Sequence, residues 1–347
     1  MENEIYRLPR ERLDALIERL GREFRVVAPV LKGSQHAWEE VRPGTPVALD
    51  YPTTLLPPRQ FFAPQREVLY RYRKGDDGVA VFEPPAPQRP VALLGVHGCD
   101  LTGLRVLRSF HESSCGDRMV TDRLDQSFIL GMACWVPCMA EAFCRDMGSL
   151  ENETPADLYA WDFGDVLLVK VLKNRGREIL SEAAPPLEAA TSDELAALRR
   201  RLRVRHEAFP AHLRFAPAKL PVALEAADSD LLWEANADRC LSCGRCNLVC
   251  PTCTCFDVHD VGTLDGREGE RVRSWHGCQI PGFSRVAGGH DFRPTRTQQL
   301  KYRVFRKGKY MPERYGMVGC TGCGRCFKHC PTHISIRDIF RQVGGTA

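Results

Sequence analysis

Residues 240–251 read CLSCGRCNLVCP, and residues 320–331 read CTGCGRCFKHCP. Both stretches space four cysteines as C-x2-C-x2-C-x3-C and follow the last one with proline. This run is typical of loops that wrap three thiolates around one face of an iron–sulfur cubane, while the fourth thiolate points towards a neighbouring cluster. Because the same spacing occurs twice, the sequence predicts two [4Fe–4S] clusters.

The pattern also predicts how the eight cysteines divide between the clusters. In two-cluster ferredoxins the fourth cysteine of each run binds the other cluster. The expected ligands are Cys240, Cys243, Cys246 and Cys330 for one cluster, and Cys320, Cys323, Cys326 and Cys250 for the other. Gly244 and Gly324 lie inside the loops, as turn formers or as small residues that let backbone N–H groups approach the sulfurs.

Structural zinc is the alternative to iron–sulfur ligation. Zinc sites also bind four cysteines, but they usually draw them from two separate C-x2-C pairs rather than from four successive cysteines followed by proline. A zinc-binding chain would be a colourless adaptor with no redox role. Visible absorbance and iron content therefore distinguish the two alternatives.

Length, charge and cysteine content restrict the class of protein. The 347 residues favour two domains, and a net charge of +4 gives no argument for nucleic-acid or membrane binding. Residues 1–20 lack the apolar stretch of a secretory signal, and no apolar run approaches the roughly 20 residues of a membrane span. We expect a cytoplasmic location, where the sixteen cysteines stay reduced and available for metal ligation.

The expected fold class is α+β, with a mixed α/β domain followed by a mainly helical, ferredoxin-like domain that holds both clusters. The predicted domains are residues 1–182 and 231–347, and residues 183–230 connect them through a Pro-rich linker and a helix. That helix begins after Thr191, with Glu194 completing a capping box. Eleven of the sixteen cysteines fall in the second domain, so the chemistry is expected there.

Hydrophobic periodicity predicts the main elements. Short β-branched or apolar runs between turn residues indicate buried strands. They are residues 24–31, 91–96, 128–132 and 166–172. Apolar residues at helical spacing indicate helices at residues 13–20 and 334–340.

Many stretches resemble the β subunit of cytoplasmic [NiFe] hydrogenases of the sulfhydrogenase type. In the C-terminal half they are RCLSCGRCNLVCPTCTCFDVHD (239–260), SWHGC (274–278), VAGG (286–289), FRPTR (292–296) and GCTGCGRCFKHCP (319–331). In the N-terminal half they are VAPVLKG (27–33), LLPPRQFF (55–62), REVL (66–69) and GVHGCDLTGL (95–104). The electron-transfer subunit of anaerobic sulfite reductase belongs to the same dicluster family, and PGFSRVAGGH (281–290) is similar to it. The N-terminal stretches favour the hydrogenase branch.

The resemblance implies a non-catalytic electron-transfer subunit of a hetero-oligomer. Such a subunit passes electrons between a flavoprotein subunit that handles NAD(P)H and the small subunit of the hydrogenase, which binds the large subunit. The chain has no G-x-G-x-x-G after a predicted strand and no G-x4-G-K-[ST], so nicotinamide chemistry is expected on another chain. The sulfite reductase alternative keeps the electron-transfer role but changes the partner.

Four cysteines in the N-terminal half suggest a third cluster. They are Cys99, Cys134, Cys138 and Cys144. Family members typically carry a Cys-Phe-Cys run here, whereas this chain has Ala142 at its first position and an additional cysteine at position 134. Because the spacing is irregular, two interpretations stay open. These cysteines bind a third iron–sulfur cluster, with Cys115 as a spare thiol, or they are ordinary cysteines without a ligand role.

Two further groups of residues have open roles. Cys253, Cys255 and Cys278 match the family pattern, and we expect them to pack as small apolar residues beside the clusters. The basic residues between the runs could dock an acidic partner, tune the cluster potentials or line a solvated helix face. They are Arg293, Arg296, Lys301, Arg303, Arg306, Lys307, Lys309 and Arg314.

Overall fold

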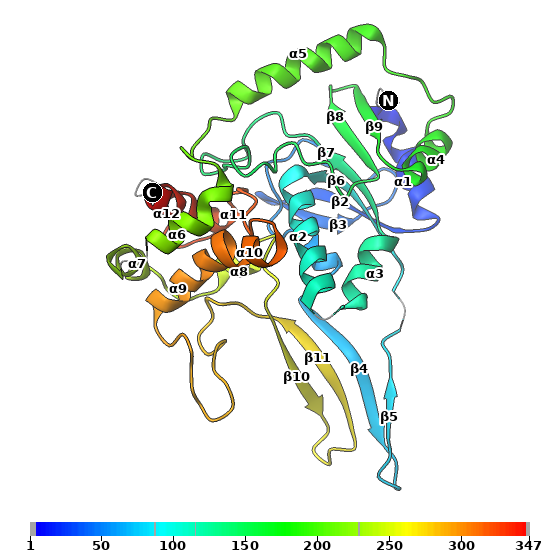
Figure 1. Ribbon diagram of the computed structural model, residues 1–347. Coiled ribbons are helices and arrows are strands. Elements are labelled where there is room, and N and C mark those ends of the chain that lie inside the picture. The colour runs from blue at the N-terminus through cyan, green and yellow to red at the C-terminus, as the bar shows by residue number, and fades with distance from the viewer. Residues whose placement is uncertain (1–4, 87, 115, 228–229, 345–347) are drawn as a thin grey trace.

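The computed structural model of the chain describes residues 5–86, 88–114, 116–227 and 230–344 (Figure 1). The fold is α+β, as the sequence predicts. It combines a seven-stranded sheet flanked by helices, a four-stranded antiparallel sheet, and a group of short helices around the cysteine runs. Cys115, the spare thiol of the predicted third cluster, lies outside the described residues.

The seven-stranded sheet comes from the first half of the chain. In spatial order its strands are β1 (Ile5–Pro9), β9 (Val166–Val171), β8 (Leu158–Asp162), β7 (Phe128–Met132), β6 (Val91–His97), β2 (Arg25–Lys32) and β3 (Gln35–Glu40). The four strands β8, β7, β6 and β2 are mutually parallel, and the outer strands are antiparallel to their neighbours. β6 and β7 are buried along their whole length, which explains their continuous apolar sequences. All four predicted strands are confirmed.

Helices cover both faces of this sheet. The helices are α1 (Leu13–Gly21), α2 (Gly98–Ser114), α3 (Arg118–Gln126), α4 (Asn174–Ala183) and α5 (Ser192–Ala208), with short 3-10 turns at Arg10–Arg12 and Pro58–Phe61. α1 and α4 pack into one hydrophobic core, and α2, α3 and α5 pack into the other. The predicted capping box of α5 is confirmed, because the Thr191 hydroxyl accepts from the Glu194 N–H and the Glu194 carboxylate accepts from the Thr191 N–H.

The four-stranded sheet joins two distant parts of the sequence. In spatial order its strands are β10 (Phe256–Gly262), β11 (Glu268–Trp275), β4 (Arg66–Lys74) and β5 (Ala80–Glu83), and they project from the body of the molecule in Figure 1. β11 lies between the cysteine runs, yet it pairs with β4 from the N-terminal half. At the root of this sheet, Arg273 of β11 forms ion pairs with Glu67 of β4 and with Asp117. The sequence did not predict the β10–β11 hairpin. The predicted domain boundaries stay predictions.

Short helices surround the two cysteine runs. They are α6 (Leu220–Ala226), α7 (Asp230–Ala237), α8 (Arg245–Leu248), α9 (Arg296–Phe305), the π-helical turn η4 (Arg306–Tyr310), α10 (Met311–Tyr315), α11 (Arg325–Lys328) and α12 (Ile336–Gly344), with a 3-10 turn at Pro217–Lys219. α12 confirms the helix predicted after the second run. Trp233, Leu300 and Phe340 anchor the shared core of this region. Among the described residues, no helix combines the length and apolar character needed to cross a membrane.

Candidate iron–sulfur centres

Each cysteine run folds as a loop followed by one helical turn. Gly244 precedes α8 with φ 71°, and Gly324 precedes α11 with φ 74°, a left-handed conformation that favours glycine. A Cβ on Gly244 would lie 2.6 Å from Ile280 Cγ1, and one on Gly324 would lie 2.6 Å from Met139 Sδ. The left-handed backbone therefore favours glycine at both positions, and any side chain there would have to displace Ile280 or Met139, so the turn-former interpretation has direct support.

The thiols of the two runs line two pockets. Cysteines of the first pocket, which we call the outer pocket, are Cys240, Cys243, Cys246, Cys326 and Cys330. Cysteines of the second, the inner pocket, are Cys250, Cys320, Cys323 and Cys326. The last cysteine of each run thus lines the pocket formed mainly by the other run, and Cys326 lines both pockets. Each pocket contains the four thiols that the sequence analysis grouped together.

The two pockets differ in their contact with solvent. Cys243 of the outer pocket is exposed, whereas Cys250 and Cys323 of the inner pocket are buried. Pro251, which follows the first run, packs against α2, since a Cβ on Gly103 would lie 2.6 Å from Pro251 Cβ. A group bound in the inner pocket would therefore be held between the short helices and the body that carries the large sheet.

Two basic side chains of the segment between the runs point towards these pockets. Arg303 lines both pockets and is 3% exposed, and Lys307 lines the inner pocket and is 4% exposed. Burial lowers the pKa of Arg303, but the nearby thiols of Cys246 and Cys326 outweigh this effect and raise it well above its usual value. Burial likewise lowers the pKa of Lys307, and the nearby Cys250 outweighs it, so that the net shift of this pKa is upward.

The other members of the basic stretch face elsewhere. Arg296 donates to the Cys240 carbonyl oxygen at 3.2 Å, and Arg293 stacks over Tyr302. Lys309, only two residues after Lys307, forms ion pairs with Glu225 and Glu313 near the surface. The stretch is therefore not one continuous surface, because Arg303 and Lys307 are buried against the pockets whereas Lys309 pairs with surface carboxylates.

The lining of the pockets fits an iron–sulfur cluster. Arg303 Nε and Thr321 Oγ1 are buried without a hydrogen-bond partner in the described part of the chain, and both residues line the pockets. Cluster sulfur and thiolate atoms accept hydrogen bonds, so a cluster would satisfy such donors. Within the described ranges, no three or more Cys, His, Asp or Glu side chains are arranged to hold a single metal ion.

The four cysteines of the predicted third cluster lie beside the second run. Cys138 Sγ is 3.9 Å from the Cys323 carbonyl oxygen, and the Phe143 N–H donates to the Gly322 carbonyl at 2.7 Å. Burial raises the pKa of Cys134 well above its usual value and that of Cys144 to about 12. Cys99 at the start of α2 is partly buried, and burial also raises its pKa.

Cys253 and Cys278 lie together behind the first run. The side-chain amide Nδ2 of Asn247 is 3.5 Å from Cys253 Sγ and 3.4 Å from Cys278 Sγ. Arg59 donates to the Cys253 carbonyl at 2.7 Å and stacks 3.5 Å above the Trp275 ring. Neither thiol lines the two pockets, and both are buried, as expected for packing residues.

Sequence reasoning missed the ion pair between Arg325 and Asp100. Arg325 directly follows Gly324 in the second run, and its two terminal nitrogens each lie 2.7 Å from one carboxylate oxygen of Asp100. Arg325 also donates to the Thr54 carbonyl at 3.1 Å. The only sequence signal was the charged Asp100 in the first turn of α2, which does not identify its partner.

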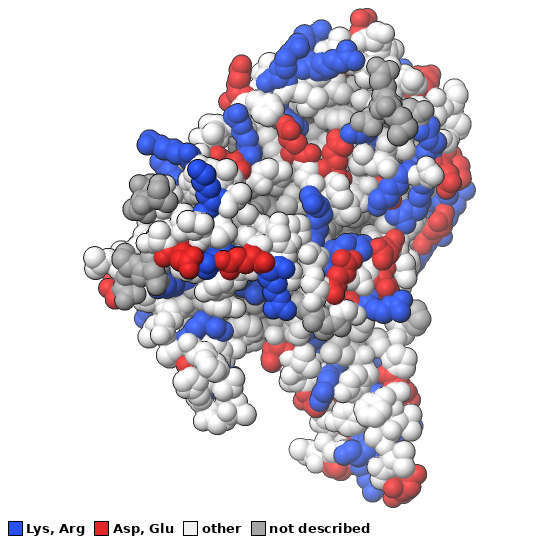
Figure 2. Space-filling view, viewed as in Figure 1, with Lys and Arg blue, Asp and Glu red and all other residues white. Residues whose placement is uncertain are grey.

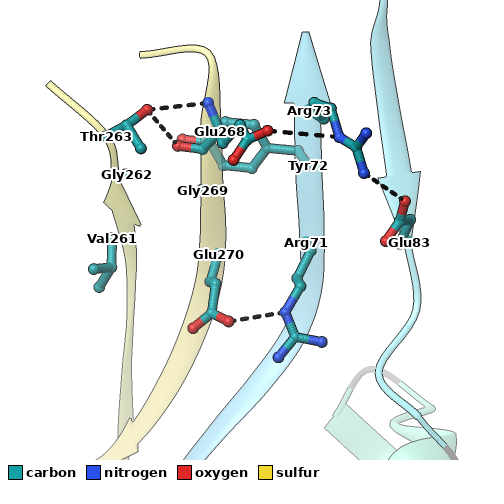
Figure 3. A pocket seen from close by; sticks show the side chains of 10 residues that line it. All are labelled: Arg71, Tyr72, Arg73, Glu83, Val261, Gly262, Thr263, Glu268, Gly269 and Glu270. Carbon is teal, nitrogen blue, oxygen red and sulfur yellow. Dashed lines mark hydrogen bonds and ion pairs between the residues drawn. The ribbon is translucent and has the colours of Figure 1, made fainter. Parts of the chain in front are cut away.

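A hollow lies on the four-stranded sheet, and no cysteine lines it (Figure 3). Its charged residues pair across the strands: Arg71 with Glu270 at 2.9 Å, and Arg73 with Glu83 at 3.5 Å and with Glu268 at 3.7 Å. Positive and negative side chains are also interspersed over the face shown in Figure 2. These features describe a solvated sheet surface rather than a chemical site.

Comparisons with known proteins agree with this geometry. Residues 239–334, which contain both runs, match the family described as 4Fe-4S dicluster domain, so the chain carries an iron–sulfur domain of the dicluster class. Its whole length is similar to sulfhydrogenase 2 subunit beta of Pyrococcus furiosus, with 31% identity over 343 residues that cover 97% of this chain and 98% of that protein. The chain belongs to the sulfhydrogenase beta-subunit family and is an electron-transfer protein, which confirms the resemblance seen in the sequence.

Proposed function

We propose that this chain carries two [4Fe–4S] clusters and relays electrons within a cytoplasmic [NiFe] hydrogenase of the sulfhydrogenase type. The electrons would pass between a flavoprotein subunit, which is linked to NAD(P)H, and the small subunit, which binds the large subunit of the same hetero-oligomer. The observation that carries the proposal is the adjacency of two cysteine-lined pockets, which share Cys326, in a chain related to a sulfhydrogenase subunit.

The proposed ligands follow the two pockets. Cys240, Cys243, Cys246 and Cys330 would hold the outer cluster, and Cys320, Cys323, Cys326 and Cys250 the inner one. The support for the exchange of fourth cysteines is that Cys330 lines the outer pocket and Cys250 the inner pocket. Cys326 lines both pockets, and we assign it to the inner cluster because its own run contributes two other cysteines there.

The cysteines of this chain would act as ligands only. When bound, each cluster supplies a site that accepts and returns one electron. The chain's contribution is to hold two such sites next to each other, with the shared lining residue Cys326 and the cation Arg303 between them. Burial of Cys250 and Cys323 excludes water from the inner site, whereas the exposed Cys243 leaves the outer site open to a partner.

Spectroscopy of cysteine variants tests the ligand sets. In the anaerobically purified complex, Cys330→Ser and Cys240→Ser should alter the same cluster signal in low-temperature EPR, and Cys250→Ser and Cys320→Ser should alter the other. Cys255→Ser, outside both pockets, serves as the matched control and should leave iron content and both signals unchanged. If Cys330→Ser and Cys320→Ser altered the same signal, the exchange of ligands would be wrong. A colourless wild-type protein without iron would contradict the whole proposal.

Co-purification tests the proposed partners. A tagged chain isolated from its own cells should bring down subunits that contain nickel and flavin. Recovery of a sirohaem protein instead would favour the anaerobic sulfite reductase alternative and contradict the hydrogenase assignment.

Cys99, Cys134, Cys138 and Cys144 carry a second proposal, a third iron–sulfur cluster. Its support is that the loop bearing Cys138 and Cys144 contacts the second run at Cys323 and Gly322, next to the inner pocket. Quantifying iron and sulfide per chain tests it. Loss of about one third of the iron in Cys134→Ser is expected for a third four-iron cluster, and unchanged iron would assign these four thiols to packing.

A further inference from the structure

We propose that Lys307 raises the reduction potential of the inner cluster, while Arg303 raises the potentials of both clusters. This inference rests on the proposed function, because it concerns the two clusters assigned above. It decides among the roles left open for the basic stretch, and it gives these two cations a different role from Lys309, which pairs with carboxylates.

The geometry around Lys307 is that of a built donor site. Its ammonium Nζ lies 3.2 Å from Cys250 Sγ, 2.9 Å from the Thr252 hydroxyl oxygen and 2.9 Å from the Gly319 carbonyl oxygen. An ammonium group has three N–H donors, and these three acceptors can use all of them. One donor is therefore directed at a thiol that we assign to the inner cluster.

The backbone fixes the lysine in this position. Lys307 lies in the π-helical turn between α9 and α10, and such turns occur often at functional sites. A Cβ on Gly319 would lie 3.1 Å from the Lys307 Cα, so the segment that leads into the second run packs directly on this turn. Lys307 thus bridges the end of the first run, through Cys250 and Thr252, to the start of the second run.

Arg303 lies one helical turn earlier on the same side of the helix. Residues four apart on a helix lie on one face, so both cations point into the same sulfur-rich interior. Arg303 lines both pockets, whereas Lys307 lines only the inner one. Lys307 should therefore act on the inner cluster, and Arg303 on both clusters.

Charge balance requires a negative partner for these cations. Burying a cation is costly unless an opposite charge compensates for the lost solvation. In the described ranges no carboxylate forms an ion pair with Lys307 or Arg303, although both are almost completely buried. A [4Fe–4S] cubane with four thiolates is a dianion when oxidised and a trianion when reduced, so it supplies the missing charge.

The same charge balance gives the direction of the effect. A fixed cation stabilises the trianion more than the dianion, because the Coulomb energy grows with the charge of the cluster. A hydrogen bond to a ligand sulfur has the same sign of effect on the potential. Removing the cation should therefore lower the potential of the cluster that it contacts.

Potentiometric titration followed by EPR tests the inference in the intact, anaerobically purified complex. Lys307→Met should shift the midpoint potential of the inner cluster downwards and change that of the outer cluster less. Lys307→Arg keeps the charge and should keep the inner potential close to that of the wild type. Lys309→Met is the matched control, since it removes the same charge two residues away, where the ammonium pairs with carboxylates instead of thiols.

The outcomes separate this inference from the proposed function. Wild-type protein without two cluster signals would contradict the proposed function itself. Two signals with an unshifted inner potential in Lys307→Met, or an equal shift in Lys309→Met, would overturn the tuning role. If Lys307→Met failed to retain the inner cluster, the Arg303→Met variant would decide. Arg303→Met should lower the midpoint potential of every cluster that it retains. Unchanged potentials in this variant would overturn the inference.

Discussion

Arg325 and Asp100 form a two-pronged ion pair in which both side chains are completely shielded from solvent. Arg325 begins the helical turn of the second cysteine run, and Asp100 lies near the start of α2, which packs on the large sheet. The pair therefore fixes the second run to the body of the fold. Burial lowers the pKa of Arg325, but Asp100 and the neighbouring thiol of Cys323 outweigh this effect and raise it well above its usual value.

Asp100→Asn should strongly destabilise the protein. The substitution leaves the buried guanidinium of Arg325 without its counter-charge, and breaking a buried ion pair on one side typically costs about 3–5 kcal/mol. The free energy of unfolding, measured by chemical denaturation under anaerobic conditions, checks this. Asp260→Asn is the matched control, because Asp260 of β10 and Arg271 of β11 also form a two-pronged ion pair, but an exposed one. An equally large loss for both variants would contradict the role of burial.

Gly322→Ala should disrupt the second cysteine loop. Gly322 has φ 70°, and a Cβ would lie 2.5 Å from the Phe143 carbonyl oxygen, a backbone atom that cannot move aside easily. The left-handed conformation alone costs roughly 1–2 kcal/mol for a residue with a side chain. Gly316→Ala measures the cost of the left-handed conformation alone, since Gly316 has φ 67° and open space around its Cα. Iron retention should fall in Gly322→Ala and stay normal in Gly316→Ala; equal retention would show that the contact with Phe143 is unimportant.

Cys250→Ala and Cys253→Ala should differ sharply although the two residues are close in sequence and space. Cys250 lines the inner pocket and receives the Lys307 hydrogen bond, whereas Cys253 lies outside the pocket against Asn247. We expect Cys250→Ala to lose the inner cluster and Cys253→Ala to keep the iron content of the wild type. Iron and sulfide analysis with EPR measures both. Loss of a cluster in Cys253→Ala would show that this thiol is a ligand and not a packing residue.

The outer cluster should be lost first when the protein is exposed to air or to an iron chelator. Cys243 of the outer pocket is exposed, while Cys250 and Cys323 of the inner pocket are buried, so reagents reach the outer site more easily. The decay of the two EPR signals over time checks this order, with Cys330→Ser identifying the outer signal. Simultaneous decay of both signals would contradict the difference in access.

Some of the structure was predictable because it depends on neighbouring residues. The strands at β6 and β7 appear in the sequence as continuous apolar runs, since a parallel strand covered on both faces has no polar side. The capping box of Thr191 and Glu194 was also predictable, since its two hydrogen bonds span three residues. The β10–β11 hairpin was not predicted. Its partner strand β4 lies far away in the sequence, and no local pattern specifies such a pairing.

The sequence by itself determined the eight candidate ligands, because the spacing of thiols around a cubane is a property of a short loop. It also predicted how these thiols divide into two sets, which stays a prediction. Only the tertiary structure decided that Arg303 and Lys307 face the thiols while Lys309 pairs with the carboxylates of Glu225 and Glu313, and that Arg325 joins Asp100. The reason is physical: the direction of a charged side chain depends on the opposite charges and the shielding that distant segments provide when they pack together.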